Sequence, residues 1–252
     1  QGSRSSYVEI ERCPLVSEEM NERLAKARLE VRQNQIRNPY KKGATLLIRE
    51  HLDGVTTNPK QIIREEVGEL VFSFPAGEFF QNNPSILESF TQYVGRKASE
   101  GGVHNLVDAY CGSGLFCLTA ASRFEAAVGI EVSEFSVQYA IENAKANNIT
   151  NARFVLGDAA SIFSQIDFSG SDSSVIIDPP RKGSSEEFLN QLLAFGPQRI
   201  VYVSCNPATQ MRDLQILTNG KYEIEEVQPF DLFPQTKHLE CVVTLTKPGS
   251  SG

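Results

Sequence analysis

Residues 106–114 have the sequence Leu106-Val107-Asp108-Ala109-Tyr110-Cys111-Gly112-Ser113-Gly114, an apolar run followed by a glycine turn. This pattern predicts a buried strand that ends at the turn, with a helix beginning directly after it. Glycine lets the backbone approach a ligand closely, and the helix N-terminus offers N–H groups that have no partner within the helix. Gly112 and Gly114 therefore indicate a ligand site, although tight packing of a strand on a helix would use the same residues.

The alternation of strands and helices continues on both sides of this turn. Helices are predicted over 84–97, 114–122, 134–147, 160–165, 185–194 and 207–218. Strands are predicted over 104–109, 126–131, 152–156, 174–178 and 199–204, and two more near 222–229 and 239–246. Such alternation indicates an α/β fold with a mostly parallel sheet and helices on both faces. The short connection between the last two strands predicts an antiparallel edge.

A small α+β segment is expected before this series. Ser17 is a suitable N-cap for a helix that ends near Arg37, where an Asn-Pro pair follows. Strands are predicted over 44–49 and 70–74, around a stretch rich in turn residues. The sequence thus divides into three parts: the segment 1–73, a main domain over 74–247 and a tail over 248–252. The ends, rich in glycine and serine, resemble linker, and we expect the natural protein to extend further at its N-terminus.

Composition describes an ordinary globular protein of 252 residues, with 40% hydrophobic and 22% charged residues. No apolar run reaches the roughly 20 residues that a membrane span requires, and no signal peptide opens the sequence. The five cysteines lack metal-type spacing and the three histidines are scattered, so we expect no metal site and a reducing, intracellular setting. The sequence does not distinguish nucleus, cytoplasm and mitochondrion, and a monomer is the expectation.

The net charge of −7 is unevenly distributed along the chain. Residues 1–65 contain 12 Lys and Arg against 9 Asp and Glu, whereas residues 66–252 contain 12 against 22. The first segment is therefore the better candidate for a surface that faces phosphate groups. The same charges could equally do no more than solvate a helix.

Acidic residues close three successive predicted strands: Asp108, Glu131 and Asp158. A single acid after a strand is often a helix cap, but three at one sheet edge favour ligand binding. Glu131 could bind both hydroxyls of a ribose, and Asp158 could accept a hydrogen bond from an adenine amino group. Phe116 and Cys117 occupy the place of the third glycine of a dinucleotide motif. The pattern resembles the Rossmann-like class I methyltransferases that use S-adenosylmethionine, a cofactor without a pyrophosphate.

Asp178 follows the apolar strand residues Val175-Ile176-Ile177 and precedes two prolines. A carboxylate at such a stiff strand end could hydrogen-bond a flat heterocycle, although a rigid turn with an aspartate cap would look the same. Many N-methyltransferases place an aromatic residue after a related Asn/Asp-Pro-Pro motif. Arg181 stands there instead, which disfavours methylation of an amino group.

Cys205 directly follows the predicted strand 199–204 and precedes Asn206-Pro207. Carbon 5 of a pyrimidine is a poor nucleophile, and addition of a thiolate at carbon 6 makes it able to attack a methyl donor. The adduct is released when a general base removes the proton from carbon 5, and Glu240 is the candidate base. A free thiol titrates near ~8.5, so Cys205 requires activation by its surroundings. The alternative is a buried, inert cysteine.

The motifs together resemble the RNA 5-methyluridine methyltransferases, in the tRNA (uracil-5-)-methyltransferase branch, and most of all its fungal members. They occur in family order over about residues 68–247: Phe79-Phe80-Gln81-Asn82-Asn83, Asp108-Ala109-Tyr110-Cys111-Gly112-Ser113-Gly114, Asp178-Pro179-Pro180-Arg181, Ser204-Cys205-Asn206-Pro207, Phe233-Pro234-Gln235-Thr236 and His238-Leu239-Glu240. Many family members have an N-terminal RNA-binding β-barrel and some an iron–sulfur cluster with four cysteines; neither pattern is found in this sequence.

The resemblance implies a methyltransferase domain over 74–247 with Cys205 as nucleophile, Glu240 as base and Asp178 in the catalytic centre. It implies S-adenosylmethionine as cofactor, held by residues at the strand ends: Gln81, Asp108, Tyr110, Gly112, Gly114, Glu131, Asp158 and Asp178. The implied substrate is a T-loop uridine of tRNA, flipped out of its stack and contacted by Gln81, Asp178 and Arg181. Two alternatives remain from the residues: a cytosine carbon-5 RNA methyltransferase, and a tRNA-binding module without catalytic activity.

Overall fold

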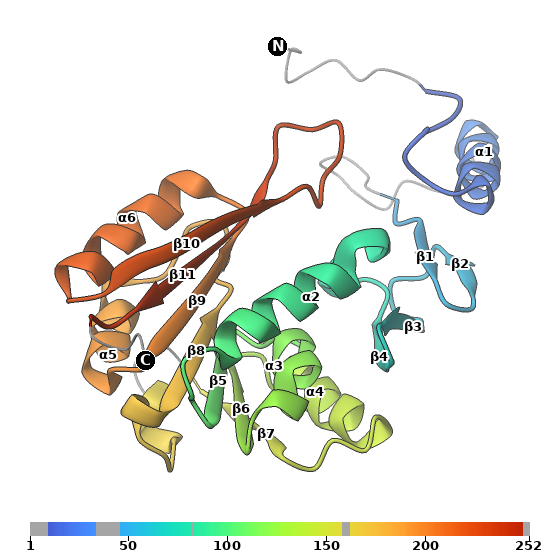
Figure 1. Ribbon diagram of the computed structural model, residues 1–252. Coiled ribbons are helices and arrows are strands. Elements are labelled where there is room, and N and C mark those ends of the chain that lie inside the picture. Colours follow the sequence, from blue (N-terminus) through green and yellow to red (C-terminus); the bar gives the residue numbers. More distant parts are fainter. Residues whose placement is uncertain (1–9, 34–45, 82, 158–161, 249–252) are drawn as a thin grey trace. The chain divides into compact units, whose positions relative to one another are not determined.

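The computed structural model describes residues 10–33, 46–81, 83–157 and 162–248. The chain divides into two units, which we describe separately: Gln1–Glu65 with Phe74–Glu78, and Glu66–Ser73 with Phe79–Gly252 (Figure 1). The division predicted at residues 73 and 74 is simpler than these two units, because residues 66–73 belong to the larger unit and residues 74–78 to the smaller one. Within the described ranges, no helix combines the length and apolar character that crossing a membrane requires.

The larger unit contains a seven-stranded sheet in the order β10-β11-β9-β8-β5-β6-β7. Its strands are β5 (Asn105–Ala109), β6 (Ala126–Glu131), β7 (Ala152–Leu156), β8 (Ser173–Ile177), β9 (Arg199–Ser204), β10 (Glu223–Phe230) and β11 (Glu240–Thr246). The five strands β5 to β9 are parallel, and β11 pairs antiparallel with β9 and with β10. The α/β class, the mostly parallel sheet and the antiparallel edge are thus confirmed.

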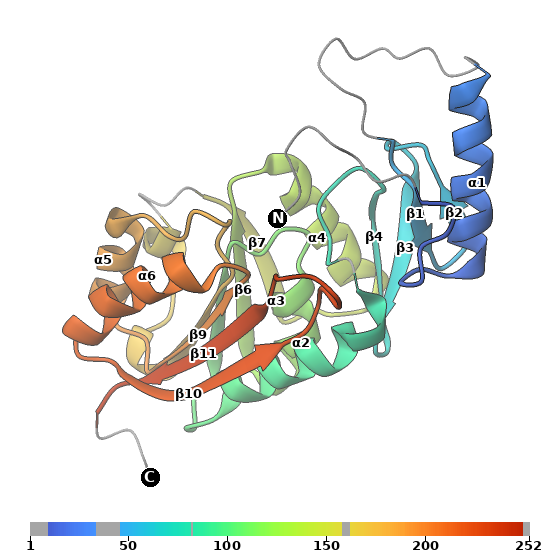
Figure 2. The same ribbon diagram turned by 90° about the horizontal axis from the view of Figure 1, so that it is seen from above.

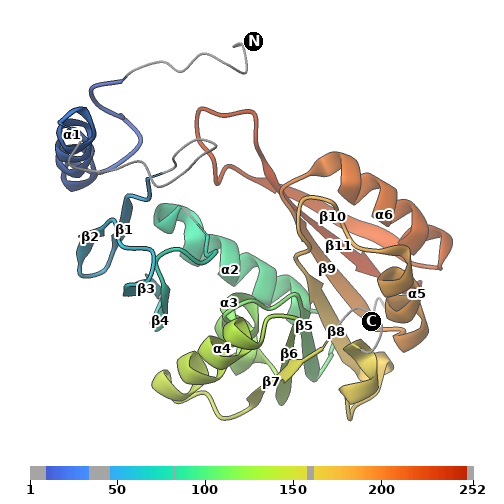
Figure 3. The same cartoon turned by 180° about the vertical axis from the view of Figure 1, so that it is seen from behind.

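Helices cover both faces of this sheet, as Figure 2 shows. The helices are α2 (Pro84–Ser99), α3 (Leu115–Ala120), α4 (Glu134–Ala146), α5 (Glu186–Phe195) and α6 (Pro207–Asn219), with short 3-10 turns η1 (Ala121–Arg123), η2 (Ile162–Gln165) and η3 (Gly170–Asp172). Side chains of α5 and α6, such as Phe188 and Leu217, share a buried core with alternate residues of β5, β6, β8 and β9. On the other face α2 contacts β8 and β9, while α4 lies along β6 and β7 (Figure 3).

The caps at the helix starts explain why these segments are helical. Asn83 and Asn206 each accept a hydrogen bond from a first-turn N–H, and each precedes a proline that is pre-set for the first helical position. Ser133 and Ser185 cap α4 and α5 in the same way. Each of these four caps places a strand-to-helix connection at a defined residue.

The smaller unit contains α1 (Glu18–Arg32) and the hairpin of β1 (Arg49–His51) and β2 (Gly54–Thr56). Ser17 caps α1 as predicted, and the described part of the helix ends at Arg32, whereas the predicted end near residue 37 lies outside the described residues. Residues 44 and 45 of the strand predicted over 44–49 lie outside the described residues, and residues 46–48 are not part of a strand, because pairing begins only at Arg49. Strands of three residues around a tight turn show too little alternation to be found from the pattern.

A second two-stranded sheet consists of β3 (Ile62–Val67) and β4 (Leu70–Pro75), which the chain joins at Gly68. The prediction over 70–74 is confirmed by β4, whereas β3 was missed. Its sequence, Ile-Ile-Arg-Glu-Glu-Val, has charged residues at three of six positions, and only Ile63 and Val67 are buried. Such a strand gives a weak apolar signal.

Gly129 in β6 permits a close approach between neighbouring strands. A Cβ atom at this position would lie 2.5 Å from the Phe154 ring and 2.9 Å from Cys111 Sγ. We expect Gly129→Ala to lower the free energy of unfolding by about 1–3 kcal/mol, because the added methyl group overpacks the sheet face. Urea unfolding measures the change, and Phe154→Leu should restore part of it in the double variant. Additive effects of the two substitutions would contradict the assigned clash.

Candidate active site

The register of the sheet brings the predicted catalytic residues to one edge. Parallel pairing aligns Ala109 with Ile177 and Ile177 with Tyr202, so β5 and β8 end at the same level and β9 continues two residues further, to Ser204. Asp178 follows β8 directly, and Cys205 follows β9. The antiparallel β11 pairs its Cys241 with Ser204, so its first residue, Glu240, begins beside the end of β9. The thiol and both predicted carboxylates therefore gather at one end of the central strands.

Cys205 lies in the connection between β9 and α6 and is half-buried. Burial raises the pKa of its thiol, and the carboxylates of Glu240 and Asp178 raise it further. A hydrogen bond from Arg181 and the positive charge of its guanidinium act in the opposite direction. The balance leaves the pKa above its usual value, so the thiol is protonated at neutral pH. A step that uses the thiolate must therefore remove this proton or strengthen the influence of Arg181.

The two carboxylates have strongly perturbed acidities. Glu240 is only 3% exposed, and burial followed by repulsion from Asp178 raises its pKa to about 8, against a lowering by Arg181. Burial raises the pKa of Asp178 to about 7. Carboxyl groups that titrate this close to neutrality can both accept and donate protons under ordinary conditions. Perturbed acids beside a thiol are typical of a catalytic centre.

Arg181 connects this group of side chains to the surrounding loops. Its Nη2 lies 3.0 Å from His238 Nδ1, two residues before Glu240. Its carbonyl oxygen accepts hydrogen bonds from Asn206 Nδ2 at 2.9 Å and from Thr209 Oγ1 at 3.2 Å. Arg181 therefore contacts the chain next to the thiol and the chain next to the candidate base. The structure thus brings together Cys205, Glu240, Asp178 and Arg181.

The glycine turn after β5 is tied to the end of β6. Tyr110, Gly112 and Gly114 have φ angles of 74°, 54° and 94°, a region that is unfavourable for tyrosine and open to glycine. The Glu131 carboxylate accepts hydrogen bonds from the N–H groups of Gly112 at 3.1 Å, Val132 at 2.9 Å and Ser133 at 3.0 Å. The carboxylate is thereby fixed at the strand end, and the adjacent Val132 is 67% exposed. The arrangement suits a ligand with a diol and an apolar ring.

Asp108 differs from the expectation that it lies at a strand end open to a ligand. It lies inside β5, is fully buried, and its Oδ2 accepts a hydrogen bond from the N–H of Cys117 at 2.8 Å. Its Oδ1 has no hydrogen-bond partner among the described residues, and burial raises the pKa of this carboxyl to about 8. Asp108 thus stabilises the start of α3 through the N–H of Cys117.

Three other predicted cofactor residues, Gln81, Gly114 and Tyr110, lie within the described part of the chain. Gln81 is buried, and Gly114 is the N-cap residue of α3. The Tyr110 ring packs against Phe188 of α5 at 5.1 Å, and burial raises the pKa of its hydroxyl. Asp158 lies outside the described residues. Among the described side chains, no His, Cys, Asp or Glu residues form a group of three that could hold a metal ion.

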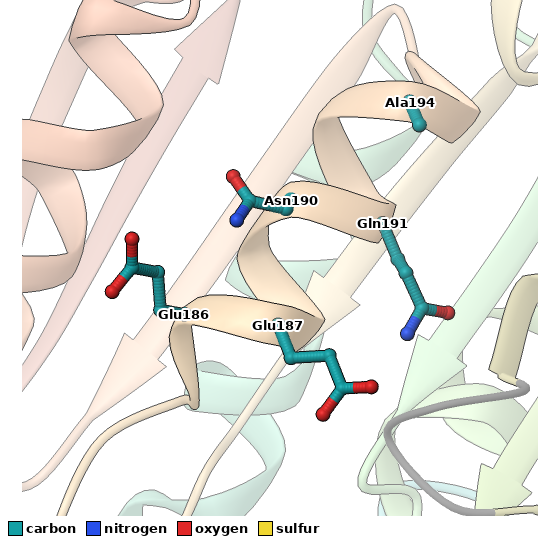
Figure 4. A pocket seen from close by; sticks show the side chains of 5 residues that line it. All are labelled: Glu186, Glu187, Asn190, Gln191 and Ala194. Atoms are coloured by element: carbon teal, nitrogen blue, oxygen red, sulfur yellow. The ribbon is translucent and has the colours of Figure 1, made fainter.

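A hollow on the surface of α5 is unrelated to these residues. Figure 4 shows that its walls come from a single helix, where Glu186, Glu187, Asn190, Gln191 and Ala194 point outward. The opposite side of the same helix carries the fully buried Phe188, Leu189 and Leu192. The hollow contains acids and amides without a nucleophile or a cation, so we assign it no chemistry.

Sequence reasoning missed a buried aspartate in α6. Asp213 is 0% exposed and accepts hydrogen bonds from Tyr202 and from the N–H of Ser184, in the loop after Asp178. A charged residue in the middle of an otherwise ordinary helix gives no motif. The only signal in the sequence is its spacing of seven residues from Asn206, which places both on one face of the helix.

Comparisons with known proteins agree with this geometry. The family model described as tRNA (Uracil-5-)-methyltransferase matches residues 54–248. A tRNA (uracil(54)-C(5))-methyltransferase of Schizosaccharomyces pombe is 46% identical over 97% of this chain and 49% of its own length. The Saccharomyces cerevisiae protein of the same description is 38% identical over 98% of this chain and 46% of its own. The chain therefore spans about half the length of these curated relatives.

A solved structure shows the same relationship. The Pyrococcus abyssi tRNA (uracil-54, C5)-methyltransferase, solved in complex with S-adenosyl-L-homocysteine, superposes with a TM-score of 0.64 at 31% identity. The superposition covers 74% of this chain and 45% of that one. The protein TYW2 of M. jannaschii, at 14% identity and a TM-score of 0.54, shares the fold alone.

The raised pKa of Glu240 predicts a pH-dependent stability. Its pKa of about 8 in the folded protein exceeds the usual 4.5, so the stability associated with this carboxyl is present below about pH 4.5 and is lost as the pH rises through 8. We expect Glu240→Gln to gain stability relative to the wild type over this range, by about 2–4 kcal/mol. Urea unfolding at several pH values measures the difference. Glu223→Gln controls for the loss of one negative charge, and a pH-independent gain in Glu240→Gln would contradict the assignment.

Proposed function

The chain belongs to the tRNA (uracil-5-)-methyltransferase family, and on this premise we propose that it methylates carbon 5 of a uridine in tRNA. The observation that carries the proposal is the group Cys205, Asp178, Arg181 and Glu240 at one sheet edge, with two carboxyls whose pKa values lie near neutrality. The yeast relatives and the archaeal structure are described as enzymes for uracil 54 of tRNA, which supports a T-loop uridine as substrate.

The first step of the proposed reaction uses Cys205. Its thiol releases a proton to water, and the sulfur forms a bond to carbon 6 of the uracil, while the electron pair of the 5,6 double bond moves toward carbon 5 and the carbonyl oxygen at position 4. Arg181 lowers the pKa of the thiol and so favours the attacking thiolate. Asp178, with a pKa of about 7, can hold a proton and donate it in a hydrogen bond to the uracil.

The second step uses Glu240. After carbon 5 has received a methyl group, its remaining hydrogen must leave as a proton so that the double bond can re-form and the sulfur can depart. Glu240, buried beside the end of β9, accepts this proton in its ionised form. A pKa of about 8 makes Glu240 a stronger base than an exposed carboxylate, although a smaller fraction of it is ionised at neutral pH.

We propose S-adenosylmethionine as the methyl donor, held at the ends of β5 and β6. The donor supplies an electrophilic methyl group on a positively charged sulfur. The Glu131 carboxylate, fixed by three N–H groups, fits the two hydroxyls of its ribose, and the exposed Val132 beside it fits an apolar face. Gln81, Tyr110, Gly112, Asp158 and Asp178 complete the proposed binding site, with Asp158 toward the adenine.

The nucleophile is tested by trapping the covalent intermediate. tRNA that contains 5-fluorouridine, incubated with the protein and S-adenosylmethionine, should form an adduct that resists denaturation, because fluorine cannot leave carbon 5 as a proton. Gel mobility and mass spectrometry of the Cys205 peptide measure it. Cys205→Ala should reduce the adduct to background, whereas Cys13→Ala controls for the loss of another accessible thiol. Equal adduct in the Cys205→Ala variant would overturn the assignment.

The base is tested with ordinary tRNA. Glu240→Gln should leave bond formation at carbon 6 intact and slow release of the methylated product by roughly 10²–10⁴-fold, the usual contribution of a general base. The covalent adduct should then accumulate on unmodified tRNA, which single-turnover measurements detect. Glu223→Gln, on the neighbouring strand β10, serves as the matched control. Product release at the wild-type rate in Glu240→Gln would assign the base to another residue.

A further inference from the structure

One face of α6 binds the loop that carries Arg181. The helix begins two residues after Cys205, and its polar side chains Asn206, Thr209, Arg212 and Asp213 contact backbone atoms of residues 181–184. We call these four residues the α6 clamp. Their spacing of three, three and one residues places them on neighbouring turns of one helix face.

The contacts of the α6 clamp follow the loop backbone in order. Asn206 and Thr209 donate to the carbonyl oxygen of Arg181, at 2.9 and 3.2 Å. Arg212 Nη2 donates to the carbonyl oxygens of Lys182 at 3.2 Å and Ser184 at 3.0 Å. Asp213 Oδ2 accepts from the N–H of Ser184 at 2.8 Å. The α6 clamp therefore binds the backbone at residues 181, 182 and 184, and the N–H of Gly183 donates to the carbonyl oxygen of Pro180 within the loop, at 2.8 Å.

Gly183 shows how closely the loop approaches the clamp. Its φ angle is +78°, and a Cβ atom there would lie 2.6 Å from Arg212 Nη2 and 2.7 Å from Asp213 Oδ2. No other residue type fits this position without displacing the ion pair between Arg212 and Asp213. The close approach leaves the loop little freedom to shift relative to α6.

Asp213 is the centre of the clamp. It is fully buried, its Oδ2 also accepts from Tyr202 Oη at 2.6 Å, and its Oδ1 accepts from Arg212 Nε at 2.8 Å and Nη2 at 2.6 Å. A buried carboxylate is stable only when hydrogen bonds and a cation compensate its desolvation, and here both are present. Asp213 therefore links the loop of Arg181 to β9, the strand that directly precedes Cys205.

We propose that Asp213 is a positioning residue that, through the α6 clamp, holds Arg181 against the sulfur of Cys205 and so sets the reactivity of the nucleophile. Asp213 acts through the loop backbone and touches neither the uracil nor the methyl donor. The inference rests on the proposed function for its biological meaning, but it concerns a property of Cys205 that exists without RNA. The charged groups that face the thiol are Arg181 and Asp178 from the loop after β8, and Glu240 from β11.

The proposal is tested by the rate at which iodoacetamide alkylates Cys205, measured as a function of pH by peptide mass spectrometry. Thiolate alone reacts, so the midpoint of the profile reports the acidity of the thiol. Asp213→Asn should raise the midpoint and slow alkylation near neutral pH by about three- to tenfold, which corresponds to a shift of about 0.5–1 unit. Arg181→Gln should cause a similar shift, and the double variant should show no further slowing, because both substitutions remove one interaction.

Tyr202→Phe is the matched control. It deletes a hydrogen bond to the same carboxylate and should lower the melting temperature, but it leaves the contact with Ser184 and should not move the midpoint. If Asp213→Asn does not fold, Arg212→Gln tests the clamp instead, because the Arg212 side chain is 53% exposed. We expect the same slowing of alkylation in this variant. An unchanged midpoint in the folded clamp variants, or additive effects with Arg181→Gln, would overturn the proposal.

The alkylation assay is independent of the methyltransferase reaction. A wild-type chain that forms no adduct with 5-fluorouridine-containing tRNA would contradict the proposed function and leave the alkylation profiles interpretable. Conversely, a normal adduct in the wild type together with unshifted alkylation in the variants would contradict only the role of Asp213. The two proposals therefore fail separately.

Discussion

The site depends on the register with which four neighbouring strands, β11, β9, β8 and β5, pair at one end of the sheet. β5, β8 and β9 run parallel, and β9 extends only two residues beyond the level at which β5 and β8 end, so the connections that follow them lie at the same end of the sheet. The antiparallel β11 runs the other way and begins where β9 ends, which places Glu240 next to the connection that carries Cys205. A one-residue slip of β11 would turn Glu240 to the other face of the sheet. Residues 178, 205 and 240 thus become neighbours through hydrogen-bond register.

Burial at this edge gives the side chains their chemistry. A carboxyl in water titrates near 4, whereas desolvation raises the pKa of Asp178 to about 7 and of Glu240 to about 8. The same desolvation raises the pKa of the Cys205 thiol, which works against a nucleophile. Arg181 opposes both effects, because its positive charge lowers the pKa of the thiol and of Glu240. The position of one guanidinium group therefore influences both reactive groups.

The sequence predicted those parts of the structure that leave a local pattern. The strand before Cys205 is apolar at its four central positions, and Asn206-Pro207 is a strong start for a helix, so the β9–α6 connection was placed correctly. The three-residue strands β1 and β2 leave no such pattern. Asp108 was placed at an open strand end because sequence position does not reveal burial. Asp213 was missed for a related reason, since its role depends on a loop about thirty residues earlier in the chain.

The electrostatics of the group also constrain the order of the proposed steps. While the thiol carries its proton, Glu240 is already difficult to ionise, and a thiolate beside it would make ionisation harder still. When the sulfur bonds to carbon 6, the thiolate is consumed and its negative charge moves into the uracil ring, away from the sulfur. Glu240 is then opposed chiefly by its burial and by Asp178, with Arg181 still favouring its charge. Glu240 therefore becomes able to accept a proton after Cys205 has reacted, and this is the order that release of the product requires.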